Sequence, residues 1–245
     1  MSQRHDPVDD SVLDEQLAYY RARAPEYDDW FERLGRFDRG AAATLAWHDE
    51  VAIVREWLAT LELAGKDVLE LAAGTGIWTA ELLAHGATVT AVDAAPEMLD
   101  RLRQRVGGAS ITTIGADLFT WEAPYEFDAV VSCFFMSHVP DEQFDRFLDL
   151  VASSVGSGGP VFLLDSARNE LSTAVDHTLP DDHDQTMRRR LDDGRSFQIV
   201  KRFRSDAELA AACARHGLVV DVRQTPQFFQ VAMGARHDSQ SALPL

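Results

Sequence analysis

The chain has 245 residues, of which 46% are hydrophobic and 26% are charged. This length and composition indicate a soluble α/β domain with room for a substantial core. Acidic residues outnumber basic residues by 40 to 23, which gives a formal net charge of −17. A field of that sign repels phosphate backbones and anionic lipid, so we expect neither nucleic acid nor membrane as a partner.

The sequence carries no sign of export. Its first residues, MSQRHDPVDDSVLDEQ, are polar and acidic, unlike a signal or transit peptide. The longest nearly apolar stretch, Ala129–Met136, is too short to span a bilayer. Cys133 and Cys213 lie in apolar sequence, which favours buried thiols over a disulfide framework. We therefore expect a cytoplasmic protein; a homodimer stays open, because nothing in the sequence reports oligomeric state.

Residues 1–40 form a polar lead-in with more aromatic residues than a disordered tail would carry. We interpret it as a helical cap that packs on the remaining chain. The aromatic residues are Tyr19, Tyr20, Tyr27, Trp30 and Phe31. Apolar residues at helical spacing from Trp47 to Leu61 then predict an amphipathic helix that ends near Gly65.

From residue 67 the pattern alternates between strands and helices. The predicted strands are 67–72, 88–93, 110–117, 127–135 and 160–166, and the predicted helices are 78–86, 96–106 and 141–155. The strands are apolar on both faces, which is typical of a parallel sheet with helices on each side. The sequence therefore predicts a doubly wound α/β fold.

The alternation breaks after Asp165. Residues 167–204 are predicted to be a lid insertion that holds a helix over 186–193 and a strand over 195–203, with Phe197, Ile199 and Phe203 on one face. A helix capped by Ser205 and two strands, 218–224 and 227–235, complete a mostly parallel seven-stranded sheet whose last strand is antiparallel and gives the sheet an antiparallel edge. We expect one domain over 41–236 and a disordered tail over 237–245.

The turn after the first of these strands, within VLELAAGTGIWT at 68–79, has the composition of a nucleotide-binding loop. The dinucleotide fingerprint needs a third glycine and an open helix N-terminus for pyrophosphate. Here Gly74 and Gly76 are followed by Trp78 and Thr79. A ligand without phosphates suits this loop better.

Acidic residues end three successive predicted strands: Glu70, Asp93 and Asp117. Asp93 could accept hydrogen bonds from two ribose hydroxyls, and Asp117 could accept from an adenine amino group. Their shared position at one sheet edge favours a nucleoside ligand, since this edge is where such folds bind ligands.

These segments, from about Asp67 to Ser166, resemble the class I S-adenosylmethionine (SAM)-dependent methyltransferases in order and spacing. VLELAAGTG, VTAVDAAPEML, GADLF and the stretch from FDAVVSCFF to FLLDS are similar to successive motifs of that family, and YYRARAPEYD resembles the cap of its small-molecule members. The resemblance implies SAM as cofactor, with these residues lining its site: Tyr20, Glu70, Ala72, Gly74, Asp93, Ala94, Met98, Asp117, Leu118 and Cys133. Ala72 departs from the family's more usual glycine, and we expect its φ to be negative.

Methyl transfer from a sulfonium depends mostly on alignment and exclusion of water. If the acceptor is a hydroxyl or protonated nitrogen, His138 is the candidate general base, with Asp165 as its orienting partner. The alternative is that both residues only cap local structure.

The insertion and the lead-in are the segments expected to bind the acceptor. Aromatic and sulfur side chains after the fourth predicted strand and within the insertion suggest an apolar or aromatic pocket: Phe134, Phe135, Met136, Phe197 and Phe203. The insertion also holds eight basic residues, which could receive an anionic acceptor, although pairing with its own aspartates is favoured. His177 and His183 lack metal-ligand spacing, so no metal is expected.

The sequence therefore predicts a methyltransferase that acts on oxygen or nitrogen of a small molecule. A NAD-dependent oxidoreductase is disfavoured by Trp78 and Thr79 and by the lack of a Tyr-x-x-x-Lys pair. A non-catalytic SAM-binding module remains the alternative from a different class.

Overall fold

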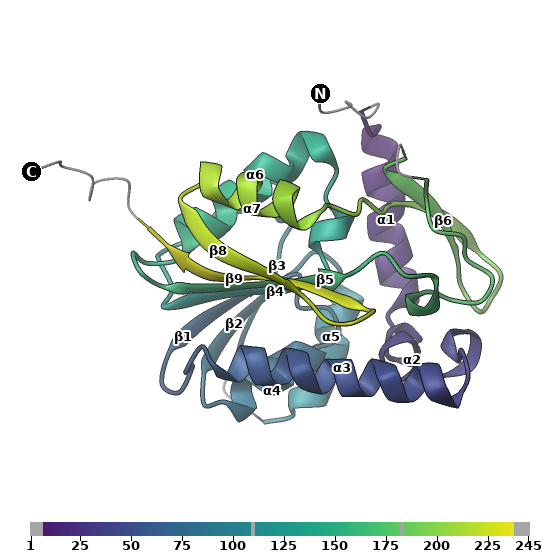
Figure 1. The fold of residues 1–245 in the computed structure, drawn as a ribbon, viewed down its shortest axis with the longest axis horizontal. Helices are drawn as coiled ribbons and strands as arrows, with labels where there is room; N and C mark the ends of the chain where they lie inside the picture. The colour runs from purple at the N-terminus through teal and green to yellow at the C-terminus, as the bar shows by residue number, and fades with distance from the viewer. Residues whose placement is uncertain (1–6, 109–110, 182–183, 238–245) are drawn as a thin grey trace, which may run out of the picture.

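The computed structural model describes residues 7–108, 111–181 and 184–237. Its centre is a seven-stranded sheet in the order β3-β2-β1-β4-β5-β9-β8 (Figure 1). The strands are β1 (Asp67–Leu71), β2 (Thr88–Asp93), β3 (Ile111–Gly115), β4 (Ala129–Cys133), β5 (Pro160–Ser166), β8 (Leu218–Gln224) and β9 (Phe229–Arg236). The five strands that precede the insertion pair in parallel, as predicted.

Helices cover both faces of the sheet, which explains why its strands are apolar throughout. Val68 and Leu69 are neighbours in β1 and are both fully buried, but they belong to hydrophobic clusters on opposite sides. Helices α3 (Ala41–Ala59), α4 (Ile77–Ala84) and α5 (Pro96–Val106) contribute to the first cluster, and α6 (Asp141–Ser154) and α7 (Asp206–Arg215) to the second. Figure 1 shows α3 and α4 on one side of the sheet and α6 and α7 on the other. The doubly wound fold is confirmed.

The last strand is antiparallel, but it is not the edge strand. β9 lies between β5 and β8 and runs antiparallel to both. β8 is therefore the edge strand, and its antiparallel pairing with β9 gives the sheet the antiparallel edge that the sequence predicted. A short turn joins β8 directly to β9, so the two strands must be antiparallel neighbours; β5 pairs with the other side of β9.

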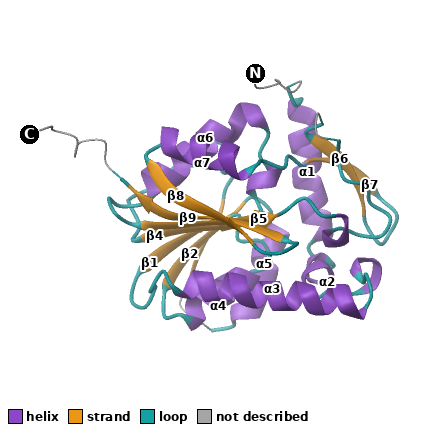
Figure 2. Ribbon diagram, in the orientation of Figure 1, coloured by secondary structure: helices purple, strands orange, loops and turns teal. Residues whose placement is uncertain are grey.

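The lead-in folds into α1 (Asp10–Arg23), α2 (Tyr27–Phe31) and the 3₁₀ turn η1 (Gly35–Phe37). Helix α1 packs beside the insertion rather than on the sheet alone (Figure 2). The side-chain oxygen of Gln16 accepts from the backbone N–H of Val200 at 2.9 Å, and that of Glu15 accepts from Gln198 at 2.7 Å. The cap and the insertion thus form one structural unit at one end of the sheet.

The insertion contains a two-stranded antiparallel sheet of β6 (Thr186–Arg190) and β7 (Ser196–Val200). The helix predicted over 186–193 is therefore wrong. Met187 and Arg189 face inward while Arg188 and Arg190 are exposed, which is the period-two alternation of a strand. The repeated arginines hid this alternation in the sequence, because inward and outward positions carry the same residue type.

Phe203 also departs from its predicted position, because β7 ends at Val200. Phe197 and Ile199 pack together against α1, but Phe203 lies outside the strand, with Lys201 Nζ 4.9 Å from its ring centroid. Two further 3₁₀ turns, η2 (Met136–His138) and η3 (Glu170–Ser172), follow β4 and β5. Of the tail predicted over 237–245, all but His237 lies outside the described residues.

None of the helices in the part of the chain that the structure describes has the length and apolarity needed to cross a membrane.

Candidate functional site

The carboxyl ends of β1, β2 and β4 and the loop after β3 open onto a cavity of about 660 Å³. This volume is within the range of small-molecule and cofactor sites. Nine of the ten residues predicted to contact a cofactor line it: Tyr20, Ala72, Gly74, Asp93, Ala94, Met98, Asp117, Leu118 and Cys133. The structure therefore brings together residues from five separate parts of the chain.

Other lining residues were not predicted from the sequence. Leu13, Gln16 and Leu17 on α1 contribute to the cavity wall, as do Gln143 and Arg146 on α6. The side-chain oxygen of Gln143 is buried and has no hydrogen-bond partner among the described residues, which leaves an acceptor for a ligand donor. The aromatic lead-in signalled that α1 packs on something, but not which side chains face a ligand.

Glu70 is the predicted cofactor residue that does not line this cavity. Its carboxyl is buried, and Oε2 accepts a hydrogen bond from the Thr79 hydroxyl at 2.5 Å. Burial raises the pKa of Glu70 to about 8, aided by the nearby charge of Asp93 and opposed by the Thr79 bond. The bond from Thr79 to Glu70 links α4 to β1.

The loop after β1 turns through left-handed backbone. Ala72 has φ of +56°, so the expectation of a negative φ there is wrong. Gly74 and Gly76 follow at +56° and +81°, and a side chain at Gly76 would come within 2.7 Å of Leu102 Cγ. A left-handed conformation costs a non-glycine residue about 1–2 kcal/mol. Phe134, which directly follows β4, is also left-handed at +62°, so two neighbouring strands both end in strained residues at the cavity.

Asp93 holds this loop in place. Its two carboxylate oxygens accept from the backbone N–H groups of Gly74 and Ala95, each at 2.8 Å. Burial raises the pKa of Asp93, and these two backbone bonds oppose the rise. Each oxygen keeps a second lone pair that could accept from a ribose hydroxyl. Asp117 is exposed at the cavity rim, where one of its oxygens accepts from the N–H of Phe119 at 2.9 Å.

His138 lies in η2, buried at the border of the cavity. Its Nδ1 is 2.7 Å from the carbonyl oxygen of Val200, so Nδ1 carries the hydrogen. Nε2 is then free to accept from the Tyr20 hydroxyl, 2.8 Å away. Burial lowers the pKa of His138 well below its usual range, and the charges of Lys201 and Arg189 lower it further. The ring is therefore neutral at physiological pH and is held in one tautomer.

Asp165 does not contact His138, although both were predicted as a catalytic pair. Its carboxylate accepts from the N–H and hydroxyl of Ser137 at 2.7 and 2.8 Å and from the N–H of Ser166 at 2.7 Å. It also lies 3.6 Å from Lys201 Nζ. Asp165 thus fixes the backbone that carries His138, because Ser137 is the preceding residue.

The predicted aromatic pocket forms in part. Phe134 and Phe135 line the 660 Å³ cavity, whereas Met136 and Phe203 line a separate, more open hollow of about 930 Å³ between the insertion and β9. Phe197 packs against Tyr19, with ring centroids 5.7 Å apart.

His177 serves the structure of the insertion. Its Nε2 accepts from the backbone N–H of Arg190 and lies 3.0 Å from an Arg36 nitrogen. Within the described ranges no three His, Cys, Asp or Glu side chains are placed to hold a metal ion, and His183 falls outside those ranges. The expectation of a metal-free site stays a prediction.

A family model described as a methyltransferase domain matches residues 68–159. The ubiquinone biosynthesis O-methyltransferase of Pseudomonas fluorescens is 32% identical over 145 residues, which is 57% of this chain and 59% of that protein. The chain thus spans about three fifths of the length of that curated relative.

Solved structures extend the comparison over nearly the whole chain. One structure of DhpI contains S-adenosylhomocysteine (SAH), and another contains SAM and HEP. Both are 35% identical to this chain, with a TM-score of 0.74. The matches cover 94% and 93% of this chain, respectively, and 99% of each DhpI chain. The Burkholderia thailandensis 1,6-didemethyltoxoflavin-N1-methyltransferase is 17% identical with a TM-score of 0.61, covering 96% of this chain and 93% of that one, and shares the fold. Taken with the sheet order and the cavity at its carboxyl edge, these similarities show that the chain belongs to the class I SAM-dependent methyltransferases.

Proposed function

We propose that the chain transfers the methyl group of SAM to an oxygen or nitrogen atom of a small-molecule acceptor. The observation that carries this proposal is the 660 Å³ cavity at the strand ends, lined by Asp93, Asp117 and Met98. Carboxylates for ribose and adenine donors, an apolar side chain, and the unpartnered Gln143 oxygen fit a nucleoside ligand. SAM supplies, when bound, a methyl group that is already electrophilic on its sulfonium.

The residues around the cavity would provide alignment and exclusion of water. Helix α1 forms one wall of the cavity through Leu13, Gln16 and Leu17, so it would shield one side of a bound acceptor from solvent. Alignment and exclusion of water can supply most of the rate enhancement for a displacement reaction. The fold of the cap and insertion is the part that differs from a bare nucleotide-binding domain.

Tyr20 and His138 are our candidates for removing a proton from the acceptor. The Tyr20 hydroxyl faces the cavity and donates to His138 Nε2. A proton leaving the acceptor could pass to the Tyr20 oxygen as the Tyr20 proton moves to Nε2, with Val200 O holding the opposite ring nitrogen. His138 then acts through Tyr20, because the Tyr20 hydroxyl already occupies Nε2.

The test compares His138→Gln and Tyr20→Phe with Tyr19→Phe as a matched control. Tyr19 is buried beside Tyr20 but lines neither the 660 Å³ cavity nor the small cavity next to it. We expect the first two variants to lower kcat by about a hundredfold to ten thousandfold, the usual range for acid–base catalysis. Titration with SAH should give affinities close to wild type. Full turnover by His138→Gln would contradict the proton-transfer role, and failure of the wild type to bind SAH would contradict the proposed function.

A further inference from the structure

A small cavity of about 30 Å³ adjoins the 660 Å³ cavity and is separate from the 930 Å³ hollow. Four residues line both: Tyr20, Tyr27, Phe134 and His138. A cavity of that size has room for a few water molecules or for one small charged group. A ligand that occupied it would extend past Tyr20 and His138 toward the SAM site.

Three cationic side chains line this small cavity. They are Arg23 from α1, Arg189 from β6 and Lys201, directly after β7, and they are 3%, 6% and 4% exposed. Among the lining residues there is a single carboxylate, Asp165, which lies 3.6 Å from Lys201. Two buried positive charges are therefore left over in a chain whose net charge is −17. Buried charges are rare without a partner, because removing an ion from water costs several kcal/mol.

The arginines keep donors that the described residues do not use. Arg23 Nη2 is buried without a hydrogen-bond partner, and its guanidinium lies over the Tyr27 ring, 4.9 Å from the centroid. Glu26 also attracts Arg23, but its carboxylate accepts from the backbone N–H of Asp192 at 3.0 Å. Arg189 Nε lies 3.3 Å from Met187 Sδ, and in the described ranges neither arginine forms an ion pair.

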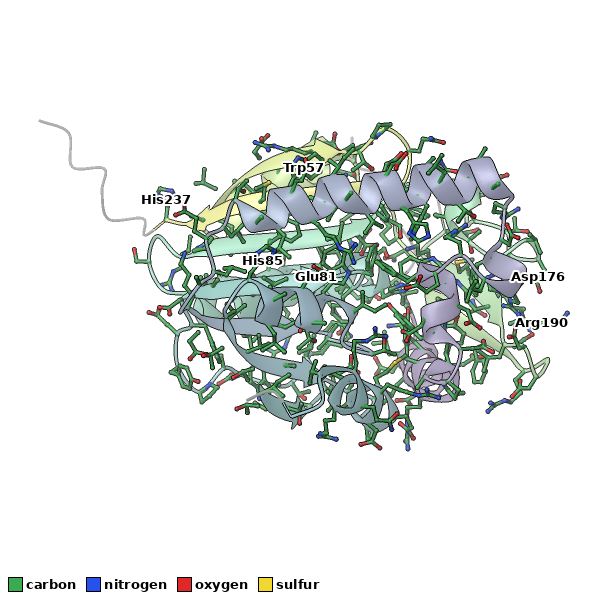
Figure 3. The ribbon with its side chains drawn as sticks, turned by 90° about the horizontal axis from the view of Figure 1, so that it is seen from below. Trp57, Glu81, His85, Asp176, Arg190 and His237 are labelled. Carbon is green, nitrogen blue, oxygen red and sulfur yellow. The ribbon has the colours of Figure 1, made fainter. Side chains whose placement is uncertain are left out.

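The outward-facing residues of the insertion behave differently. Arg195 pairs with Asp193 at 2.7 Å, as expected from the sequence. Arg190 lies at the end of the molecule with Asp176, opposite His237 (Figure 3), and Arg188 is exposed. The strand register alone places Arg189 inside, so the prediction that the insertion's cations pair with its own aspartates is wrong for Arg189. It is also wrong for Lys201, which pairs with Asp165, and for Arg202 and Arg204, which pair with Asp141, because both aspartates lie outside the insertion.

We propose that the small cavity binds an anionic group of the methyl acceptor, a carboxylate or a phosphoryl group, through Arg23, Arg189 and Lys201. This inference rests on the proposed function, since it names the class of acceptor for the same site. Guanidinium groups bind both anions through pairs of N–H donors. Lys201 and Ser137 hold the Asp165 carboxylate, which limits its repulsion of the bound group.

The test is calorimetric titration of the whole protein, with and without SAH, using methylphosphonate, acetate and the neutral analogue acetamide. We expect both anions to bind and acetamide not to bind, and the tighter anion identifies the acceptor's charged group. Arg189→Gln should weaken anion binding by about tenfold to a hundredfold, the usual loss for a charged hydrogen bond. Arg188→Gln, the neighbour on the exposed side of β6, should bind the anions as wild type does.

The outcomes separate the two proposals. SAH binding with acetate and methylphosphonate no tighter than acetamide would overturn the anionic-acceptor inference alone. Anion binding without SAH binding would overturn the proposed function and, with it, the role of the anion as methyl acceptor, while the small cavity would stand as an anion site. Should Arg189→Gln fail to fold, Arg23→Gln makes the same test from α1, and wild-type anion affinity in the folded variant would overturn the inference.

Discussion

Replacing Glu70 with glutamine should stabilise the protein, and by more as the pH rises. The pKa of Glu70 is raised from 4.5 to about 8 in the folded chain, chiefly by burial. The folded state therefore binds this proton more tightly than the unfolded state does. Stability from this group is fully present below pH 4.5 and is lost as the pH rises toward 8. Glutamine is nearly isosteric with the protonated carboxyl and keeps an oxygen for the Thr79 hydroxyl.

The size of the effect follows from linkage. Between about pH 6 and pH 8, a shift of this size removes about 2 kcal/mol of unfolding free energy from the wild type and none from Glu70→Gln. Urea denaturation at the two pH values measures the difference between the proteins, and both lie above the sequence pI of about 4.7. Glu122→Gln, which replaces an exposed glutamate, is the control and should change stability by less than about 0.5 kcal/mol at either pH. A Glu70→Gln difference that stays constant with pH would refute the reasoning, because a carboxyl with an ordinary pKa gives no such dependence.

Two further predictions concern the loop that follows β1. Ala72→Gly should raise the unfolding free energy by about 0.5–1 kcal/mol, since it removes a left-handed penalty of about 1–2 kcal/mol and adds a smaller unfolded-state entropy. Ala73→Gly, at a buried loop position outside the left-handed region, should lower it by about 1 kcal/mol, through added unfolded-state entropy and the loss of a buried methyl group. If thermal denaturation shifts in the same direction for both variants, the backbone explanation is contradicted. Asp93→Asn should weaken SAH binding by tenfold or more, because an amide cannot accept from both Gly74 and Ala95. Calorimetric affinity within threefold of wild type would show that Asp93 does not organise the site.

The sequence was sufficient for the sheet and for its ligand-binding edge because both leave local signals. Each strand of the parallel core is a short apolar run, and β2, β3 and β5 end in a polar or glycine residue that marks the turn. Asp93 and Asp117 could therefore be placed at one edge without any long-range information. Met98 followed from helical spacing, and it lines the cavity and packs with Tyr20 and Tyr27.

The parts that the sequence did not predict depend on contacts between distant segments. The misassignment of 186–193 is the exception, because β6 and β7 form a local hairpin within 186–200 and the repeated arginines concealed its strand alternation. The sequence marked His138 and Asp165 as polar residues at strand ends, but not that Tyr20, 118 residues away, would occupy Nε2. Ala72 was misjudged for another reason: its residue type does not report φ in a loop, and this loop is held by the bond from the Gly74 N–H to Asp93 on the neighbouring strand.

The site divides into two halves with different chemical characters. The strand ends supply acidic and apolar groups for a nucleoside, whereas α1, β6 and the segment after β7 supply the buried cations Arg23, Arg189 and Lys201. Tyr20 and His138 stand where the halves meet, and the same cations that would hold an anion lower the pKa of His138. An anion in the small cavity would offset that effect and make His138 a stronger base. Acceptor binding would then prepare the base as well as position the acceptor, so the proton is taken only when the acceptor is in place.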